Sequence, residues 1–417
     1  MPAIMKEQIV RSINDPEALE MLFRKDKRGF TLGFPDASAG VESALVSFWQ
    51  IRLKEETAGQ KSQLPTTGLW RVAVISFVLA LLVKGHLLSG GKMEDFWLRN
   101  LPTIAFGGLT AWFIFENRLA GVKNILLLAL PAVILAVFIN LLPGIQSDTT
   151  RLALIHAPVF MWFIFGMAWV SLGYSNTQRV TAFIRYNGEL LIMYGLLCIA
   201  GTILSGMTIS LFAITRMEIG HFYMQNIGVV GVAVLPVVAA WLTGLYPDIT
   251  SRIAPIIARI FTPLVLVSAV VYLVAVTVSG IDHSRNREFL IIFNLLLLGV
   301  MAIIVFSLAD LDKSDIRKLN VILLFLLAAV TLIIDLFALS AIISRLSEGF
   351  TPNRTVVLVS NILFLGNLLL ILPDLFLAGF KGKPLARVER IICGYLPVYF
   401  LYCIVVIFLF PFIFGIK

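Results

Sequence analysis

A small number of ionisable and amide side chains lie inside long apolar stretches of this sequence, and these are the residues that could bind a ligand or carry a proton. Asp335 lies near the middle of the stretch from Leu319 to Ser344. Burying such a charge in a bilayer is costly, so groups of this kind usually face a partner or water. Six further candidates lie nearer the ends of other apolar stretches: Lys84, His86, His156, His221, Asn226 and Asn361.

With a cytosolic N-terminus, all seven side chains fall in the outer half of the membrane, while Asn367 is central and Asp374 lies deeper. We therefore predict an outward-opening polar cavity lined by the seven. The alternative is purely structural. In that case Lys84 and His86 extend to the interface, the other two histidines hydrogen-bond near it, and Asp335 pairs with one neighbouring donor.

The sequence has no recognisable catalytic or cofactor signature. It contains no GxSxG nucleophile elbow, HExxH pair, Walker loop or dinucleotide-binding fingerprint. Cys198, Cys393 and Cys403 all lie in apolar stretches, and none forms a pair with the spacing of metal ligands. We expect no catalytic residue, no cofactor and no metal site. These absences favour a protein that is not an enzyme, and an intramembrane enzyme is the least favoured class.

Composition excludes a soluble globular protein. Of the 417 residues, 59% are hydrophobic and only 14% are charged, and the mean hydropathy is +0.93. Soluble domains are nearer half apolar and a quarter charged. The fold class is therefore all-α, a polytopic helical membrane protein. The net charge of +8 does not indicate nucleic acid, because the basic residues lie mostly in short connectors, where they orient membrane spans.

Eleven stretches approach or exceed the roughly 20 apolar residues that cross a bilayer. They are Trp70–Leu88, Leu101–Phe115, Val122–Leu142, Leu152–Tyr174, Leu190–Ile214, Ile219–Tyr246, Ile256–Ser279, Phe289–Ala309, Leu319–Ser344, Thr355–Phe380 and Ile391–Phe414. The fourth and fifth are joined by a basic connector, so we predict that they form a membrane hairpin.

Basic residues in the short loops set the predicted orientation. A cytosolic N-terminus places fifteen Lys and Arg residues on the inner side and nine on the outer side. The excess on the inner side predicts an N-in, C-out topology.

The first 65 residues differ from the rest and predict a small helical cap in the cytosol. Asp15 followed by Pro16 is a helix start, and a second helix is predicted from Val41, Leu45, Phe48 and Trp49 on one face. The cap and its linker cover residues 1–65, and the transmembrane bundle covers 66–417. The cap either packs on the bundle or the lipid interface, or binds a protein partner.

Several segments resemble a known bacterial family. They are the run HAPVFMW from His156, RYNGE from Arg185, FWLRN from Phe96, and the early EALEMLFRKDKRGF and SFWQIRL. Together they resemble the polytopic membrane family catalogued as domain of unknown function 4153, in the Bacteroidetes-type form with a cytosolic N-terminal extension. The resemblance implies a bacterial inner-membrane location and no particular activity.

Two functional classes follow from these features. The first is a transporter or lipid-handling permease, with membrane lipids, a lipid or another small molecule as ligand, and with proton or ion coupling through Asp335 and through His156 or His221. The second is a non-transporting membrane sensor or assembly factor that engages a protein partner through residues 1–65.

Overall fold

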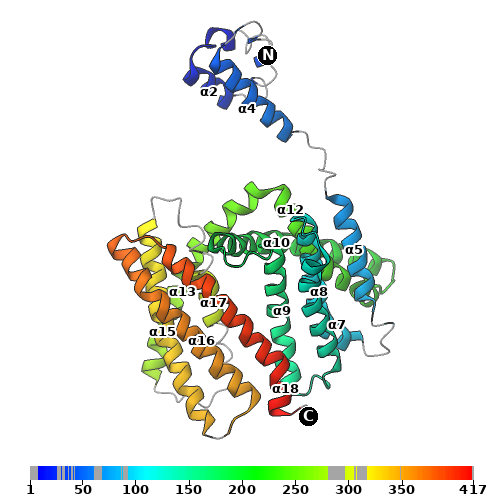
Figure 1. The fold of residues 1–417 in the computed structure, drawn as a ribbon. Coiled ribbons are helices and arrows are strands. Elements are labelled where there is room, and N and C mark those ends of the chain that lie inside the picture. The colour runs from blue at the N-terminus through cyan, green and yellow to red at the C-terminus, as the bar shows by residue number, and fades with distance from the viewer. Residues whose placement is uncertain are drawn as a thin grey trace. The chain divides into compact units, whose positions relative to one another are not determined.

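The computed structural model describes residues 8–25, 43–60, 68–85, 93–279, 296–304, 317–347 and 349–415, together with positions 30, 33–35, 37, 38, 41, 87 and 307. These residues are mostly helical, and none of them lies in a strand, which confirms the all-α fold (Figure 1). The chain divides into two compact units, Met1–Leu69 and Trp70–Lys417. The sequence-based boundary between residues 65 and 66 lies four residues earlier.

The N-terminal unit contains helices α2 (Pro16–Lys25) and α4 (Ala44–Gln60). The Asp15 carboxylate accepts hydrogen bonds from the backbone N–H groups of Glu17 and Ala18, at 3.0 and 3.1 Å. This is the helix start that the sequence predicts. On α4, in contrast, Phe48 is 55% exposed, and Val46 and Leu53 are buried together with Trp49, so the buried face of this helix differs from the predicted one.

An aromatic core holds this unit together. The core rings are Phe23, Phe30, Phe34 and Trp49, and Phe30 lies 4.9 Å from Trp49 between centroids. The guanidinium of Arg52 lies 4.6 Å from the centroid of the Trp49 ring and pairs with Glu20 at 2.7 Å. The N-terminal unit therefore has a hydrophobic core of its own, made of its own residues.

The unit from 70 to 417 is a membrane-embedded helical bundle. Among its described residues, seven helices are long and apolar enough to cross a membrane. They are α8 (Val122–Leu141), α9 (Asp148–Trp169), α10 (Thr177–Ile214), α11–η1–α12 (Gly220–Tyr223, Met224–Gly228 and Val229–Leu245), α15 (Arg317–Leu346), α16 (Pro352–Lys381) and α17–η4–α18 (Ala386–Ile404, Val405–Leu409 and Phe410–Phe414).

The other four predicted spans are not among these seven helices. Helix α5 (Leu69–Val83) has 15 residues, and the second predicted span is the latter part of α7 (Met93–Glu116). Helix α13 (Pro247–Ser279) contains only a shorter apolar part. Much of the predicted span 289–309 lies outside the described residues. The count of eleven is therefore not confirmed.

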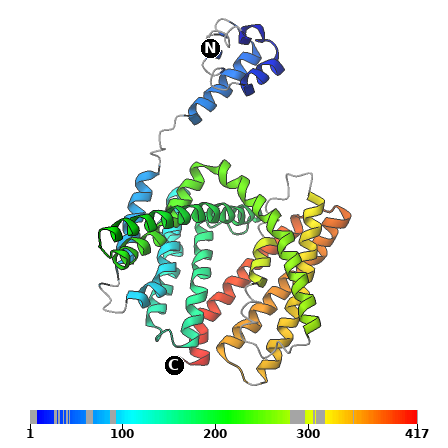
Figure 2. The ribbon, with the colours of Figure 1, turned by 180° about the vertical axis from the view of Figure 1, so that it is seen from behind.

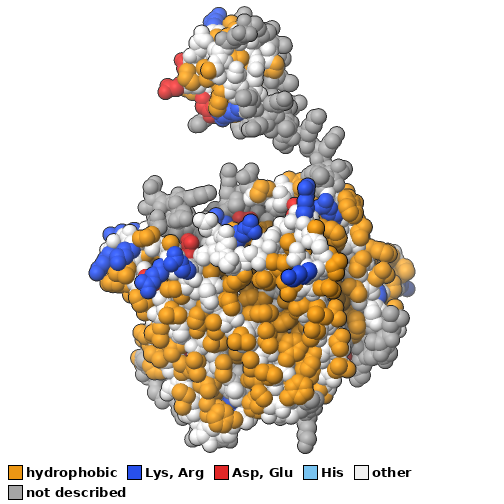
Figure 3. Space-filling model, in the orientation of Figure 1, with side chains coloured by type: hydrophobic (Ala, Val, Ile, Leu, Met, Phe, Trp, Pro, Cys, Tyr) orange, Lys and Arg blue, Asp and Glu red, His pale blue; other side chains and the backbone are white. Residues whose placement is uncertain are grey.

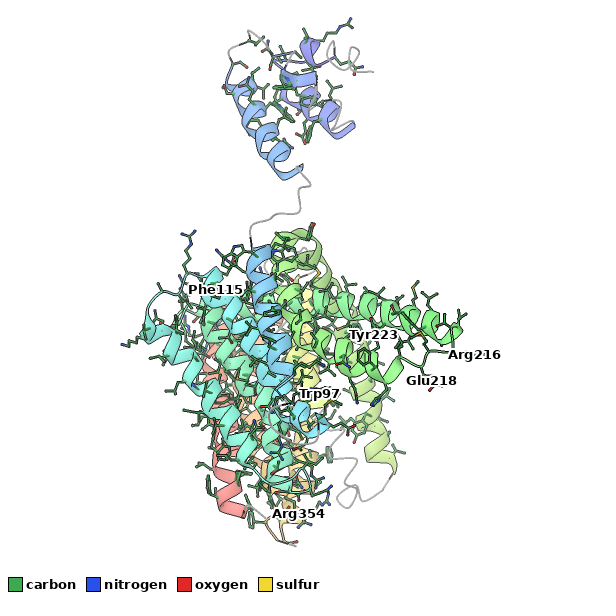
Figure 4. All side chains as sticks on the ribbon, turned by 90° about the vertical axis from the view of Figure 1, so that its right-hand side faces the viewer. Trp97, Phe115, Arg216, Glu218, Tyr223 and Arg354 are labelled. Atoms are coloured by element: carbon green, nitrogen blue, oxygen red, sulfur yellow. The ribbon has the colours of Figure 1, made fainter. Side chains whose placement is uncertain are left out.

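Helix α10 runs across α9 instead of antiparallel to it (Figures 1 and 2). This differs from the predicted hairpin. The Phe183 ring packs against Phe165 and Trp169, at 5.3 and 5.8 Å between centroids. Gly166 makes room for it, because a Cβ there would lie 2.9 Å from the Phe183 ring. Helix α10 instead pairs with α12, and Figure 4 shows Arg216 and Glu218 at the tip between them.

The surface of this bundle is strongly apolar. Figure 3 shows a broad hydrophobic face, with Lys and Arg gathered along its upper edge. On α8, for example, Leu126, Leu130 and Val133 are each more than half exposed. Apolar surface of this extent is stable only in contact with lipid or with other protein.

The segment FWLRN at the start of α7 binds the ends of two other helices. The indole N–H of Trp97 donates to the backbone carbonyl of Val83, at the end of α5, at 3.1 Å. The buried Arg99 guanidinium donates to three carbonyls at the end of α8, those of Ile139, Leu142 and Pro143, at 2.6, 3.1 and 2.7 Å.

Two further contacts complete this junction. Asp95 pairs with the Nε of Arg99 at 2.9 Å. The side-chain amides of Asn100 and Asn140 donate to each other, at 3.0 and 2.7 Å. A helix leaves its last carbonyls without intrahelical partners, so Arg99 satisfies the end of α8 from within the protein, and the Asn100–Asn140 pair joins the two helices beside it.

We predict that Arg99→Met lowers the free energy of unfolding by roughly 2–4 kcal/mol, because it leaves three buried carbonyls without a charged donor. Arg151→Met is the matched control, since Arg151 is exposed and pairs with Asp148 on its own helix; its effect is about 1 kcal/mol or less. Denaturation of the purified protein in mixed micelles measures both. Equal effects of the two substitutions would contradict the role given to Arg99.

Candidate functional site

A cavity of about 550 Å³ lies among α9, α10, residues 296–304, α16 and α17. We call it the central cavity. Most of its wall is aliphatic or aromatic. Its polar lining residues are His156, Asn187, Ser360, Asn367, Tyr399 and Tyr402. Apolar walls with a few placed polar groups are typical of small-molecule sites.

His156 and Tyr402 form one part of the wall. The Nδ1 of His156 lies 2.8 Å from the backbone carbonyl of Leu152. A carbonyl only accepts, so Nδ1 carries a hydrogen and Nε2 is the ring nitrogen left for a ligand. The His156 ring lies edge-on to that of Tyr402, with 5.4 Å between centroids, and the Tyr402 hydroxyl donates to the carbonyl of Val356 at 3.1 Å. The wall of the cavity therefore contains an imidazole whose orientation is fixed by its hydrogen bond to the Leu152 carbonyl.

Trp162 and Asn187 form a second part, where the corner between α9 and α10 closes. The indole N–H of Trp162 donates to Oδ1 of Asn187 at 2.8 Å, and Nδ2 of Asn187 donates to the carbonyl of Phe183 at 2.6 Å. Thus the HAPVFMW run of α9 and the RYNGE segment of α10 meet in the wall of the central cavity.

Asn367 and Tyr399 form the third part. Nδ2 of Asn367 donates to the hydroxyl of Tyr399 at 3.1 Å. The Asn367 side chain is buried, and its Oδ1 has no hydrogen-bond partner among the described residues. Tyr395 lies one turn before Tyr399, and Gly366 leaves space for its hydroxyl, because a Cβ at 366 would lie 2.7 Å from it.

A second hollow, the apolar groove, has a volume of about 430 Å³ and lies among α8, α9, the start of α10 and α17. It shares Trp162, Phe163 and Leu396 with the central cavity. At one end Tyr174 donates to the carbonyl of Cys393 at 2.5 Å. An elongated apolar chain could therefore lie beside a ligand in the central cavity.

The structure does not bring the seven predicted residues to one cavity. His156 lines the central cavity. Asp335 is fully buried on α15. Asn361 is fully buried on α16 and does not line the cavity, and neither atom of its amide has a partner among the described residues.

Two of the predicted residues meet elsewhere. Nζ of Lys84 donates to Oδ1 of Asn226 at 2.6 Å and lies 3.5 Å from the carbonyl of Gln225. Asn226 belongs to the π-helix η1, a form in which the normal helix bonds are displaced. His221 is exposed on α11, and His86 lies outside the described residues. The structure thus supports a lysine–asparagine contact for Lys84.

The most informative wall residues were not among the predicted site residues. Tyr399 and Tyr402 sit in an apolar stretch, where tyrosine is also common as a packing residue, and Asn187 lies in a segment that reads as a connector. One pattern in the sequence does indicate the tyrosines of the cavity wall. Tyr395, Tyr399 and Tyr402 recur at helical spacing, which places three hydroxyls on one face.

The described residues contain no group of three or more His, Cys, Asp or Glu side chains that could hold a metal ion. No protein-family model matches the sequence, and no curated protein or solved structure is detectably similar to it.

Proposed function

We propose that the protein binds a lipid-like amphipathic molecule in the central cavity and moves it within the membrane. The observation that carries this proposal is the lining of the cavity. Its walls are aliphatic and aromatic, its polar groups are neutral amides, hydroxyls and an imidazole, and none of its described lining residues is Asp, Glu, Lys or Arg.

The chemistry of the lining favours a lipid over a charged water-soluble substrate. A charged ligand in a dry site needs a paired charge or a dense set of hydrogen bonds. An amphipathic molecule needs only a few polar contacts and a large apolar surface. The adjoining apolar groove, which shares Trp162 and Phe163 with the cavity, has the lining that an acyl chain would contact.

We predict that Val159→Trp reduces lipid capture, because Val159 lines the central cavity and an indole would occupy part of it. The effect on labelling by a photoactivatable phospholipid should be roughly tenfold or more. Val133→Trp is the matched control, since Val133 is an exposed valine of α8 that lines neither hollow. Peptide mapping of the labelled protein in liposomes measures the labelling of α9 and α17.

Equal labelling of the two variants would remove the cavity as the lipid site. Movement between leaflets is measured separately with a fluorescent phospholipid in proteoliposomes. A protein that captures lipid but leaves the leaflet exchange rate of empty liposomes unchanged would limit the proposal to lipid binding.

We further propose that the N-terminus lies in the cytosol of a bacterial cell, that the bundle lies in the inner membrane, and that the protein is a member of the family that the sequence resembles. The basic edge of the bundle supports this orientation (Figure 3). Exposed basic residues lie at helix ends that the topology assigns to the inner side: Arg118, Lys123, Arg179, Lys381 and Lys383.

Cysteine labelling tests the orientation. In a background without the three native cysteines, we predict that Gln146→Cys, before α9, reacts with an impermeant maleimide added to intact cells from which the outer membrane has been removed. Ser175→Cys, after α9, should react only after lysis. The reverse pattern would invert α9 and exclude the proposed topology.

The N-terminal unit supports a second candidate function, a sensor or assembly factor that binds a protein partner. Its own aromatic core allows it to fold as a separate unit, and Met21 and Phe48 are 66% and 55% exposed on its surface. Aromatic residues and methionine are enriched at protein–protein interfaces relative to the rest of the surface, so these two side chains are candidate contact residues.

A photoreactive amino acid tests this second function in cells. We predict that one placed at Phe48 crosslinks to a discrete partner protein, whereas one at Glu17, an exposed position of α2, does not. Crosslinks that are equal at the two positions, or that are absent at Phe48, would contradict a partner site on this surface.

A further inference from the structure

We infer that Asp335 binds a monovalent cation of about the size of sodium, in a site of oxygen ligands among α15, α16 and α17. The inference starts from an unpaired charge. The Asp335 side chain has no exposed surface, and neither carboxylate oxygen has a hydrogen-bond partner among the described residues. An ionised carboxylate in such a place is strongly destabilising unless a positive charge or a proton accompanies it.

Thr331 supplies a second oxygen. It lies four residues before Asp335, so both side chains project from the same face of α15. Thr331 is also fully buried, and its hydroxyl has no partner among the described residues. A buried threonine in a helix can satisfy its hydroxyl through the carbonyl four residues earlier, but Thr331 does not do so here.

The antiparallel register of α15 and α16 brings a third oxygen to the same level. A Cβ at Gly379 would lie 3.1 Å from Ile322, so these two residues face each other. Asp335 comes thirteen residues after Ile322, and the residue thirteen before Gly379 is Gly366. Asp335 therefore lies level with Gly366 and Asn367, whose Oδ1 is the unpaired oxygen.

Tyr399 connects the set to α17. Its hydroxyl accepts from Nδ2 of Asn367. The ligands are thus one carboxylate and neutral hydroxyl and amide oxygens. Oxygen ligands suit hard cations, and a single negative charge matches a monovalent ion. The set includes no sulfur or imidazole, which the common transition metals prefer.

The proposed cation site and the central cavity share two side chains, because Asn367 and Tyr399 also line the cavity. Cation binding would fix the orientation of the Asn367 amide and the Tyr399 hydroxyl, the two groups that a ligand in the cavity would also contact. This coupling rests on the proposed lipid function, but the cation site does not.

Thermal unfolding of the full-length protein in detergent at pH 8 tests the site, with sodium chloride compared with choline chloride at equal ionic strength. We expect sodium to raise the unfolding midpoint by roughly 2 °C for each tenfold excess over its dissociation constant. Asp335→Asn should abolish the rise. Asp374→Asn is the matched control, because Asp374 lies on α16 but pairs with Arg387 at 3.3 Å, and it should retain the full rise.

Thr331→Val removes one ligand oxygen while keeping the shape of the side chain, so it should weaken the sodium response even if Asp335→Asn does not fold. The inference is overturned if the wild-type protein shows no sodium-specific rise, or if Asp335→Asn or Thr331→Val responds like the wild type. Stabilisation by acid alone, without a sodium effect, would assign a proton to Asp335 and also overturn it. Val159→Trp should keep the sodium response, so a failure of the lipid proposal is distinguishable from a failure of this one.

Discussion

The hydrogen bonds at the helix ends are the constraint on which this bundle depends. A backbone carbonyl at the end of a membrane helix has no partner in its own helix, and lipid offers none. Here side chains of neighbouring helices supply the donors. Arg99 donates to the carbonyls at the end of α8, and Trp97 donates to the last carbonyl of α5. The Asn117 amide donates to the carbonyls of Ala168 and Trp169 at the end of α9, at 2.9 and 3.0 Å. Because Trp97, Arg99 and Asn117 all belong to α7 or directly follow it, this helix fixes the ends of three others.

A second constraint, the corner at Gly166, produces the central cavity. With the Phe183 ring seated against Gly166, α10 has to leave α9 at a steep angle instead of packing along it. An antiparallel α10 would cover the flank of α9, which carries His156 and Trp162. The crosswise course leaves much of this flank to α16 and α17, which contribute Asn367, Tyr399 and Tyr402, while residues 296–304 contribute apolar side chains and α10 contributes Asn187. The same glycine therefore determines both the direction of α10 and the chemistry of the cavity wall.

The sequence predicts those features of this protein that depend on local composition. The Asp15–Pro16 helix start and seven long apolar helices follow from capping chemistry and stretch length, since neither requires knowledge of what lies across the bundle. The direction of α10 could not be predicted, because hydropathy carries no information on orientation and the decisive contact joins residues seventeen apart, Gly166 and Phe183. The same holds for the site. Asp335 was conspicuous as a charge, but the contacts between Lys84 and Asn226 and between Asn367 and Tyr399 join distant helices, so no local pattern reveals them.

Asn367 links the two functional inferences, and the link has a thermodynamic consequence. If a cation at Asp335 orders the Asn367 amide that a ligand in the cavity also contacts, the cation changes the affinity for the ligand. The ligand must then change the affinity for the cation by the same factor. A cation present at different concentrations on the two sides of a membrane would therefore favour ligand binding on one side. The Asn367 amide could provide this link, because its nitrogen donates to Tyr399 while its oxygen has no hydrogen-bond partner among the described residues. Coupling of this kind needs no large rearrangement of the helices, only a change in the orientation or mobility of a side chain that both sites share.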